Sequence, residues 1–291
     1  MARKVSVTGG KGGTGKSTIA VNLALELACL EELVLADLDV EAPNDHIILG
    51  VKLEGEEPVT IMLPVIEYEK CSACGSCAKV CDTGAIIAPK GRLPMVLPRL
   101  CSGCRACMLV CPNNAIREGR RVIGFTYETP ISLGGRRITL VTGMLREGEE
   151  HVSPVVVAGR RRAESVGARF MLVDTAAGTG NTVSIALEGS KLAIAVTEPT
   201  PLGEHDLKLI LELLGEMSIE AWVVVNRAGI GSEERVRKLA SQYGARVVAR
   251  IPYSRRLLES YVSGVPIVLM RPEDPISLVF RKLAKEIVEV V

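Results

Sequence analysis

The residues that could do chemistry in this 291-residue chain form two groups, a glycine-rich turn and eight closely spaced cysteines. The turn runs from Gly10 to Ser17 and fits the pattern G-x-x-x-x-G-K-[ST]. Glycines suit such a turn because backbone N–H groups must approach phosphate oxygens closely and the backbone must adopt positive φ angles. Lys16 would reach the β- and γ-phosphates, and the Ser17 hydroxyl would bind Mg²⁺. The spacing therefore predicts a site for a nucleoside triphosphate with magnesium.

The same glycines allow a second interpretation. Gly10, Gly12 and Gly15 also spell G-x-G-x-x-G. Asp37 ends the next predicted strand, as in a dinucleotide-binding unit. A dinucleotide site has no role for the lysine–serine pair that closes the turn, whereas a triphosphate–magnesium site requires both residues. We therefore favour the triphosphate, and titration with NADH against ATP separates the two interpretations.

The cysteines form two copies of the spacing C-x₂-C-x₂-C-x₃-C, and the second copy starts 30 residues after the first. The first copy comprises Cys71, Cys74, Cys77 and Cys81, and the second comprises Cys101, Cys104, Cys107 and Cys111. Apolar residues around them repeat at the same offset, which indicates an internal duplication. Two C-x₂-C pairs can hold zinc. Eight cysteines in this duplicated order fit two iron–sulfur clusters better.

This spacing matches that of bacterial ferredoxins with two [4Fe–4S] clusters, in which the fourth cysteine of each run binds the other cluster. Asp82 departs from the pattern, because a ferredoxin usually carries proline there, but that residue is not a ligand. The resemblance implies one cluster held by Cys71, Cys74, Cys77 and Cys111. It implies a second cluster held by Cys101, Cys104, Cys107 and Cys81.

Composition limits the classes of protein that fit. The chain is 47% hydrophobic but only 3% aromatic, so the core is expected to be aliphatic. A net charge of +1 gives no electrostatic case for binding nucleic acid or a membrane surface. No apolar run has the length of a membrane span. Nine cysteines without a visible export signal favour metal binding over disulfides, and hence the cytoplasm. The ninth, Cys29, is expected to be a buried residue of the first helix.

The elements that must position these residues alternate between strands and helices. An apolar strand containing Val5 and Val7 precedes the turn, and a helix opens at Lys16. Further strands are expected at residues 33–36, 138–141, 170–173, 192–196, 221–225 and 247–251. Helices are expected at residues 155–166, 181–187, 205–217, 233–243 and 275–290. This alternation predicts an α/β fold with a doubly wound, mostly parallel sheet.

The strand–helix rhythm is broken once, by the segment that carries the cysteines. We expect residues 59–118 to form an inserted small α+β domain of the bacterial ferredoxin type. Residues 1–58 and 119–291 would then be the two parts of one P-loop ATPase domain.

The turn resembles the deviant Walker A motif of the MinD/ParA family, K-G-G-x-G-K-[ST], here Lys11 to Ser17. That family is related to the nitrogenase iron protein and to Mrp-type ATPases. The resemblance spans nearly the whole chain and implies a homodimer with ATP at the interface, in which Lys11 reaches the nucleotide of the partner. The nucleotide contacts that it implies are Gly12, Gly13, Thr14, Gly15, Lys16, Ser17 and Thr18.

Polar residues at predicted strand ends complete the expected site, because ligands of such sheets bind at the carboxyl ends of strands. By resemblance, Asp39 positions or activates the attacking water, and Asp37 supports the magnesium side. Asp174 would hold Mg²⁺ through water, and the backbone N–H of Gly178 would turn toward the γ-phosphate. Asn226 is the candidate contact for adenine. Helix capping for Asp174 and a turn position for Asn226 are the open alternatives.

The function that these features favour is an ATP-hydrolysing protein in which nucleotide state gates electron transfer from two [4Fe–4S] clusters to a protein partner. GTPases and ATPases move their γ-phosphate-sensing loops when that phosphate is lost, and the cysteine segment follows such a loop. The alternative is a protein that assembles or carries clusters, like the Mrp-type ATPases. A ParA-like positioning protein is a third hypothesis, disfavoured by the neutral charge. No nucleic-acid or membrane partner is expected.

Overall fold

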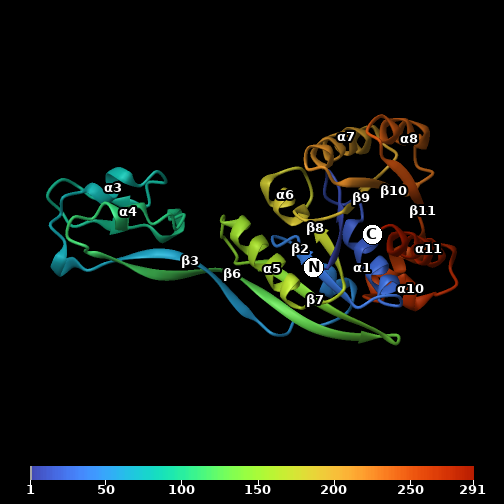
Figure 1. The fold of residues 1–291 in the computed structure, drawn as a ribbon, viewed down its shortest axis with the longest axis horizontal. Helices are drawn as coiled ribbons and strands as arrows, with labels where there is room; N and C mark the ends of the chain where they lie inside the picture. The colour runs from blue at the N-terminus through green and yellow to red at the C-terminus, as the bar shows by residue number, and fades with distance from the viewer. Residues whose placement is uncertain (1) are drawn as a thin grey trace.

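The computed structural model describes residues 2–291 and has two parts, a body of helices around a sheet and a long arm with a small tip (Figure 1). Both ends of the chain lie in the body. The tip, residues 67–115, lies at the far end of the arm from the sheet.

One sheet of nine strands organises the body. Its parallel strands are β1 (Arg3–Thr8), β2 (Leu33–Leu38), β7 (Arg136–Leu145), β8 (Phe170–Thr175), β9 (Leu192–Thr197), β10 (Glu220–Ala228) and β11 (Arg246–Pro252). Two antiparallel strands, β3 (Glu57–Ile66) and β6 (Ile116–Leu133), complete it. The order is β11-β10-β9-β1-β8-β2-β7-β6-β3. The predicted α/β class with a doubly wound, mostly parallel sheet is therefore confirmed.

Helices cover both faces of the sheet, and apolar strands between them are buried on both sides. On one face lie α1 (Lys16–Leu27), α2 (Asp45–Ile48), α9 (Arg255–Ser263), α10 (Ile267–Met270) and α11 (Pro275–Val290). On the other lie α5 (Val152–Ser165), α6 (Asn181–Leu187), α7 (Pro201–Glu216) and α8 (Glu233–Gln242). Helix α11 packs on α1 through residues such as Phe280 and Ile287, both fully buried.

Several local predictions differ from the structure. Cys29 is exposed, because α1 ends at Leu27 and the chain then turns. Helix α7 begins at Pro201, four residues before the predicted start, because the Thr200 side chain caps it by accepting a hydrogen bond from the Gly203 N–H. The short helices α9 and α10 were not predicted. No helix in residues 2–291 has the length and apolar character needed to cross a bilayer.

The arm consists of β3 and β6, which pair antiparallel from Glu57 opposite Thr126 to Ile66 opposite Ile116. Strand β6 continues into the body, where it pairs with β7. The sequence predicted no strand within the insert expected at residues 59–118, although β3 contains the apolar run 61–66, because Pro64 weakens that run as a strand signal. The domain limits expected at residues 59 and 118 both fall within the arm.

The tip has the internal repeat that the cysteine spacing predicts. Its elements are η1 (Tyr68–Lys70), α3 (Ser76–Val80), β4 (Ile86–Ile87), β5 (Met95–Val96), η2 (Pro98–Leu100) and α4 (Ala106–Leu109). Positive φ angles recur at the 30-residue offset, at Ala73 and Gly103, Gly75 and Arg105, and Gly84 and Asn114. The non-glycine members adopt this backbone at an energetic cost. The two halves therefore share one backbone path.

A substitution tests the packing that joins the arm to the body. A Cβ added to Gly124 of β6 would lie 2.6 Å from the Met144 carbonyl oxygen and 2.8 Å from Cγ2 of Val155. Gly124→Ala should lower the free energy of unfolding by about 1–3 kcal/mol through overpacking, measured by denaturant melts. The matched control is Gly215→Ala in α7, where a Cβ meets nothing within 4 Å and helix propensity improves. Equal stability of the two variants would contradict this packing.

Candidate functional site

The glycine-rich turn joins the end of β1 to the start of α1, as the sequence predicts. Gly13 and Gly15 have φ angles of 78° and 90°, which glycine adopts without strain. A side chain at Gly15 would also meet the amide nitrogen of Asn226 at 2.4 Å. Gly15 is the N-cap of α1, and no side chain caps the helix there. The first N–H groups of α1 are therefore available to an anion.

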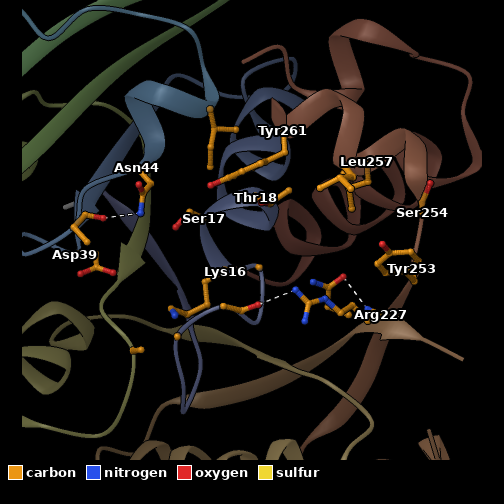
Figure 2. A pocket seen from close by; sticks show the side chains of 18 of the residues that line it. Lys16, Ser17, Thr18, Asp39, Asn44, Arg227, Tyr253, Ser254, Leu257 and Tyr261 are labelled. Atoms are coloured by element: carbon orange, nitrogen blue, oxygen red, sulfur yellow. Dashed lines mark hydrogen bonds between the residues drawn. The ribbon is translucent and has the colours of Figure 1, made fainter. Parts of the chain in front are cut away.

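A cavity of about 540 Å³ opens in front of this turn (Figure 2). Among the predicted residues, it is lined by Gly12, Gly13, Gly15, Lys16, Ser17, Thr18, Asp39 and Asn226. Lys16 is nearly buried, and its ammonium group donates to the Lys11 carbonyl at 3.3 Å. The cavity thus brings a lysine, a helix N-terminus and a carboxylate together, which suits a phosphate chain with a cation.

The far end of the cavity is apolar and was not predicted. Its walls are supplied by the end of β11 and by α9. These residues are Pro252, Tyr253, Leu257, Leu258 and Tyr261. Polar groups at one end and aromatic and aliphatic groups at the other fit the phosphates and base of a nucleotide. Helix α9 was not predicted, although Leu257, Leu258 and Tyr261 recur in it at helical spacing; that spacing does not say that the face they form borders a cavity.

The predicted carboxylates lie at two depths. Asp39 lines the cavity, and burial raises its pKa while the Lys16 ammonium opposes the rise. Asp37 and Asp174 lie deeper, side by side on the paired strands β2 and β8. Burial raises the pKa of Asp174 to about 7 and that of Asp37 well above its ordinary value, and the two carboxyls oppose each other's ionisation. A divalent cation nearby would favour the charged forms.

Sequence reasoning missed a third buried carboxylate, Asp45 at the start of α2. Its oxygens, with those of Asp37 and Asp174, offer ligand atoms within 4.8 Å of one another. Neither Asp45 oxygen has a hydrogen-bond partner among the described residues, and the backbone N–H of Asp45 donates to Asp37 at 3.1 Å. Asp45 therefore adds negative charge behind the predicted magnesium side. A four-residue helix gives no periodicity from which its burial could be read.

Two predicted contacts are engaged within the protein. The Asn226 amide donates to the Thr14 carbonyl at 2.6 Å, so it ties the end of β10 to the turn. The Gly178 N–H donates to the Gly9 carbonyl at 3.0 Å. Gly178 has a φ of 96° but does not line the cavity, whereas its neighbour Ala177 does. The Gly178 N–H must leave Gly9 before it can turn toward a γ-phosphate.

The eight repeated cysteines gather around two hollows in the tip. One hollow is lined by Cys71, Cys74, Cys77 and Cys111. The other is lined by Cys81, Cys101, Cys104 and Cys107. Each hollow thus receives three cysteines from one repeat and one from the other, the grouping that the sequence predicts. The second hollow also borders Met62 and Pro64 of β3, so it lies against the arm.

Comparison with known proteins fits the geometry of the body. The family model described as CobQ/CobB/MinD/ParA nucleotide binding domain (CbiA) matches residues 5–267. The chain belongs to this family of P-loop ATPases.

Its relatives include an uncharacterized protein of Methanocaldococcus jannaschii, 34% identical over 261 residues and 89% of each chain. An iron–sulfur cluster carrier protein of Pyrococcus horikoshii is 26% identical over 98% of this chain and 85% of its own. Among solved structures, the septum site-determining protein MinD of Pyrococcus horikoshii, complexed with Mg-ADP, superposes with a TM-score of 0.61. It is 20% identical, over 99% of this chain and 96% of its own, and it shares the fold.

Tyr261 provides a test of the apolar end of the cavity. Its side chain points from α9 across the cavity toward Thr18 (Figure 2). Tyr261→Ala should raise the Kd for ATP and for ADP about two- to tenfold, because one aromatic contact contributes about 0.5–1.5 kcal/mol. Calorimetric titration measures both constants. Tyr243→Ala is the matched control, since Tyr243 lies outside this cavity, and equal constants for the two variants would remove Tyr261 from the site.

Proposed function

We propose that this MinD/ParA-type ATPase binds and hydrolyses ATP with Mg²⁺ and that its nucleotide state gates electron transfer from two [4Fe–4S] clusters to a protein partner. The clusters would occupy the two hollows of the tip and would supply one-electron redox chemistry. The observation that carries the proposal is the grouping of the cysteines, three from one repeat and one from the other at each hollow. Cysteines that bind nothing would have no reason to be shared between the two repeats in this way.

Sulfur spacing also favours clusters over zinc. Four sulfurs at 2.3 Å from a tetrahedral zinc ion lie about 3.8 Å apart. Among residues 2–291, only a group of aspartates, and no group of cysteines, brings three such ligand atoms within 4.8 Å of one another. No three thiols of either hollow therefore lie as close together as the sulfurs of a tetrahedral zinc site.

The residues of the body support the proposed ATP chemistry. Lys16 and the N-terminus of α1 would bind the phosphates, and Ser17 would meet the magnesium ion. The buried Oδ1 of Asp174 has no hydrogen-bond partner among the described residues, and a carboxylate oxygen is a ligand of the kind that Mg²⁺ takes. Asp39, half-buried and close enough to Lys16 for the ammonium to oppose the rise of its pKa, would orient a water at the γ-phosphate. In this proposal Lys11 acts on the nucleotide of the second protomer of a homodimer.

A short series of main-chain hydrogen bonds connects the segment around Asp39 to the arm. Strand β2, which leads to Asp39, pairs with β7. The Val40 carbonyl, one residue after Asp39, accepts a hydrogen bond from the Leu145 N–H at 2.7 Å. Leu145 pairs in turn with Gly124 of β6, the strand that continues into the arm. A shift of the Asp39 segment on hydrolysis would therefore displace β6 through these bonds.

Metal analysis of cysteine variants tests the ligand sets. We expect about eight iron and eight sulfide ions per chain purified without air, because two [4Fe–4S] clusters contain that number. Cys74→Ala and Cys104→Ala should each lose about half of both, since each removes a ligand from one cluster. Cys29→Ala is the control and should lose none, because Cys29 follows α1 and lies in neither hollow. Zinc in place of iron in the wild-type chain would overturn the proposal.

Coupling is tested on the reduced protein. Reoxidation of the clusters by an added acceptor protein, followed by absorbance, should change about fivefold or more when ATP with Mg²⁺ replaces ADP, the scale of ordinary allosteric coupling. Lys16→Ala should retain the cluster spectrum but lose this dependence. A wild-type rate that ignores the nucleotide would contradict gating.

The names of the relatives favour a second candidate function, an iron–sulfur cluster carrier. Chains with that name are 24% to 27% identical over nearly all of this chain. A carrier would pass intact clusters to an acceptor that lacks them and would lose iron itself. Retention of all iron in the presence of such an acceptor separates electron transfer from cluster transfer.

A further inference from the structure

The carboxylate of Glu198 lies outside the predicted site but contacts two of its cations. Glu198 directly follows β9 and is only 5% exposed. Its Oε2 lies 3.6 Å from the Lys11 ammonium, and its Oε1 accepts a hydrogen bond from Arg227 at 2.6 Å. A buried carboxylate requires such partners, because an unpaired charge is costly away from water. None of the roles assigned above uses Glu198.

These contacts hold the part of the glycine-rich turn from Lys11 to Thr14, and they come from the ends of β9 and β10. Besides its pair with Glu198, Arg227 donates to the Gly13 carbonyl at 3.2 Å (Figure 2). Asn226 donates to the Thr14 carbonyl. The backbone of Glu198 is held as well, since its carbonyl oxygen accepts a hydrogen bond from the Thr200 N–H at 2.8 Å. Arg227 and this backbone contact therefore keep Glu198 in place if Lys11 moves outward.

The two cations on Glu198 are not equivalent. Arg227 makes a short hydrogen bond and has a second anchor on the turn. Lys11 makes a longer contact, at 3.6 Å; since the Arg227 side chain is the more exposed of the two (45% against 28%), the shorter bond and the second anchor, not burial, mark Arg227 as the fixed cation. If Lys11 leaves, Glu198 keeps Arg227 as its counter-ion, so the departure does not leave an unpaired buried charge. Lys11 is thus the releasable partner and Arg227 the fixed one.

We propose that Glu198 is a positioning residue that stores the Lys11 ammonium on its own protomer and so sets the ATP concentration at which dimers form. The inference rests on the proposed homodimer, in which Lys11 must reach the nucleotide of the second protomer. Every dimer contact by Lys11 then begins with the loss of its contact with Glu198. Weakening that contact makes dimerisation easier.

Dimerisation is measured on the full chain, purified without air, by sedimentation during titration with ATP and Mg²⁺. Glu198→Gln keeps the size of the side chain and removes its charge. The ATP midpoint for dimer formation should fall about two- to fivefold, the range of a partly exposed ion pair. Glu286→Gln is the matched control, because it removes a carboxylate from an ion pair with Lys282 on α11, outside the cavity, and its midpoint should not fall. An unchanged midpoint in Glu198→Gln overturns the inference.

A second readout does not depend on dimers. Without nucleotide, the rate at which an amine-acylating reagent labels Lys11, relative to the exposed Lys52, is followed by mass spectrometry. Glu198→Gln should raise this ratio about two- to fivefold and Glu286→Gln should not. Glu198→Asp, one methylene shorter with the charge kept, should fall between the wild type and Glu198→Gln and serves if the latter does not fold.

The two readouts separate failure of the inference from failure of the proposed function. If the wild-type chain never dimerises but Lys11 labelling responds to Glu198→Gln, the proposed homodimer is wrong and storage of Lys11 stands. If the wild-type chain dimerises with ATP and neither readout responds, the homodimer stands and the role of Glu198 is wrong.

Discussion

The pairing of β2 with β8 on one side and β7 on the other is the constraint on which the rest of the structure depends. Because β2 and β8 run parallel and in register, Asp37 lies opposite Asp174, and both point into one buried space behind the glycine-rich turn. Because β2 also pairs with β7, the same strand supports the edge from which the arm leaves. One central strand therefore belongs to both the nucleotide cavity and the connection to the cysteines.

The carboxyl groups buried at this edge of the sheet outnumber the cations around them in the protein alone. Asp37, Asp45 and Asp174 are buried together, and burial raises the pKa of each. The charge of Lys16 lowers the pKa of Asp39 and of Asp174 and so partly compensates this burial. Carboxyls in this setting favour a cation that brings its own charge and accepts oxygen ligands. This excess of buried negative charge fits a site whose charge is balanced when it binds a divalent cation.

The sequence predicted those parts of the molecule that are built by local rules. The glycine-rich turn, the buried strands and the helices with long apolar faces were found, because each leaves a periodic or positional signal. The two copies of the cysteine spacing likewise predicted the shared backbone of the tip. What failed was set by tertiary contacts. Cys29 continues an apolar stretch but falls after the helix ends. Asp45 is buried because the chain after β2 turns back, so that the Asp45 N–H bonds the Asp37 carboxylate. Helix α9 and the strands of the arm do carry local patterns, but those patterns do not say that α9 borders the cavity or that the two strands pair as a ribbon.

The arm has a consequence for how such a chain could arise and change. Its two strands are joined by main-chain hydrogen bonds from Glu57 to Ile66 and from Ile116 to Thr126. Such bonds use the main-chain N–H and C=O groups that every residue except proline carries, so they make few demands on side-chain identity. A ribbon held in this way connects the tip to the body mainly through backbone bonds. The tip could therefore be replaced during evolution without changing the side chains that pack the core of the body. The backbone pairing of the arm thus makes the molecule modular. The same body could be joined in this way to tips of different sequence.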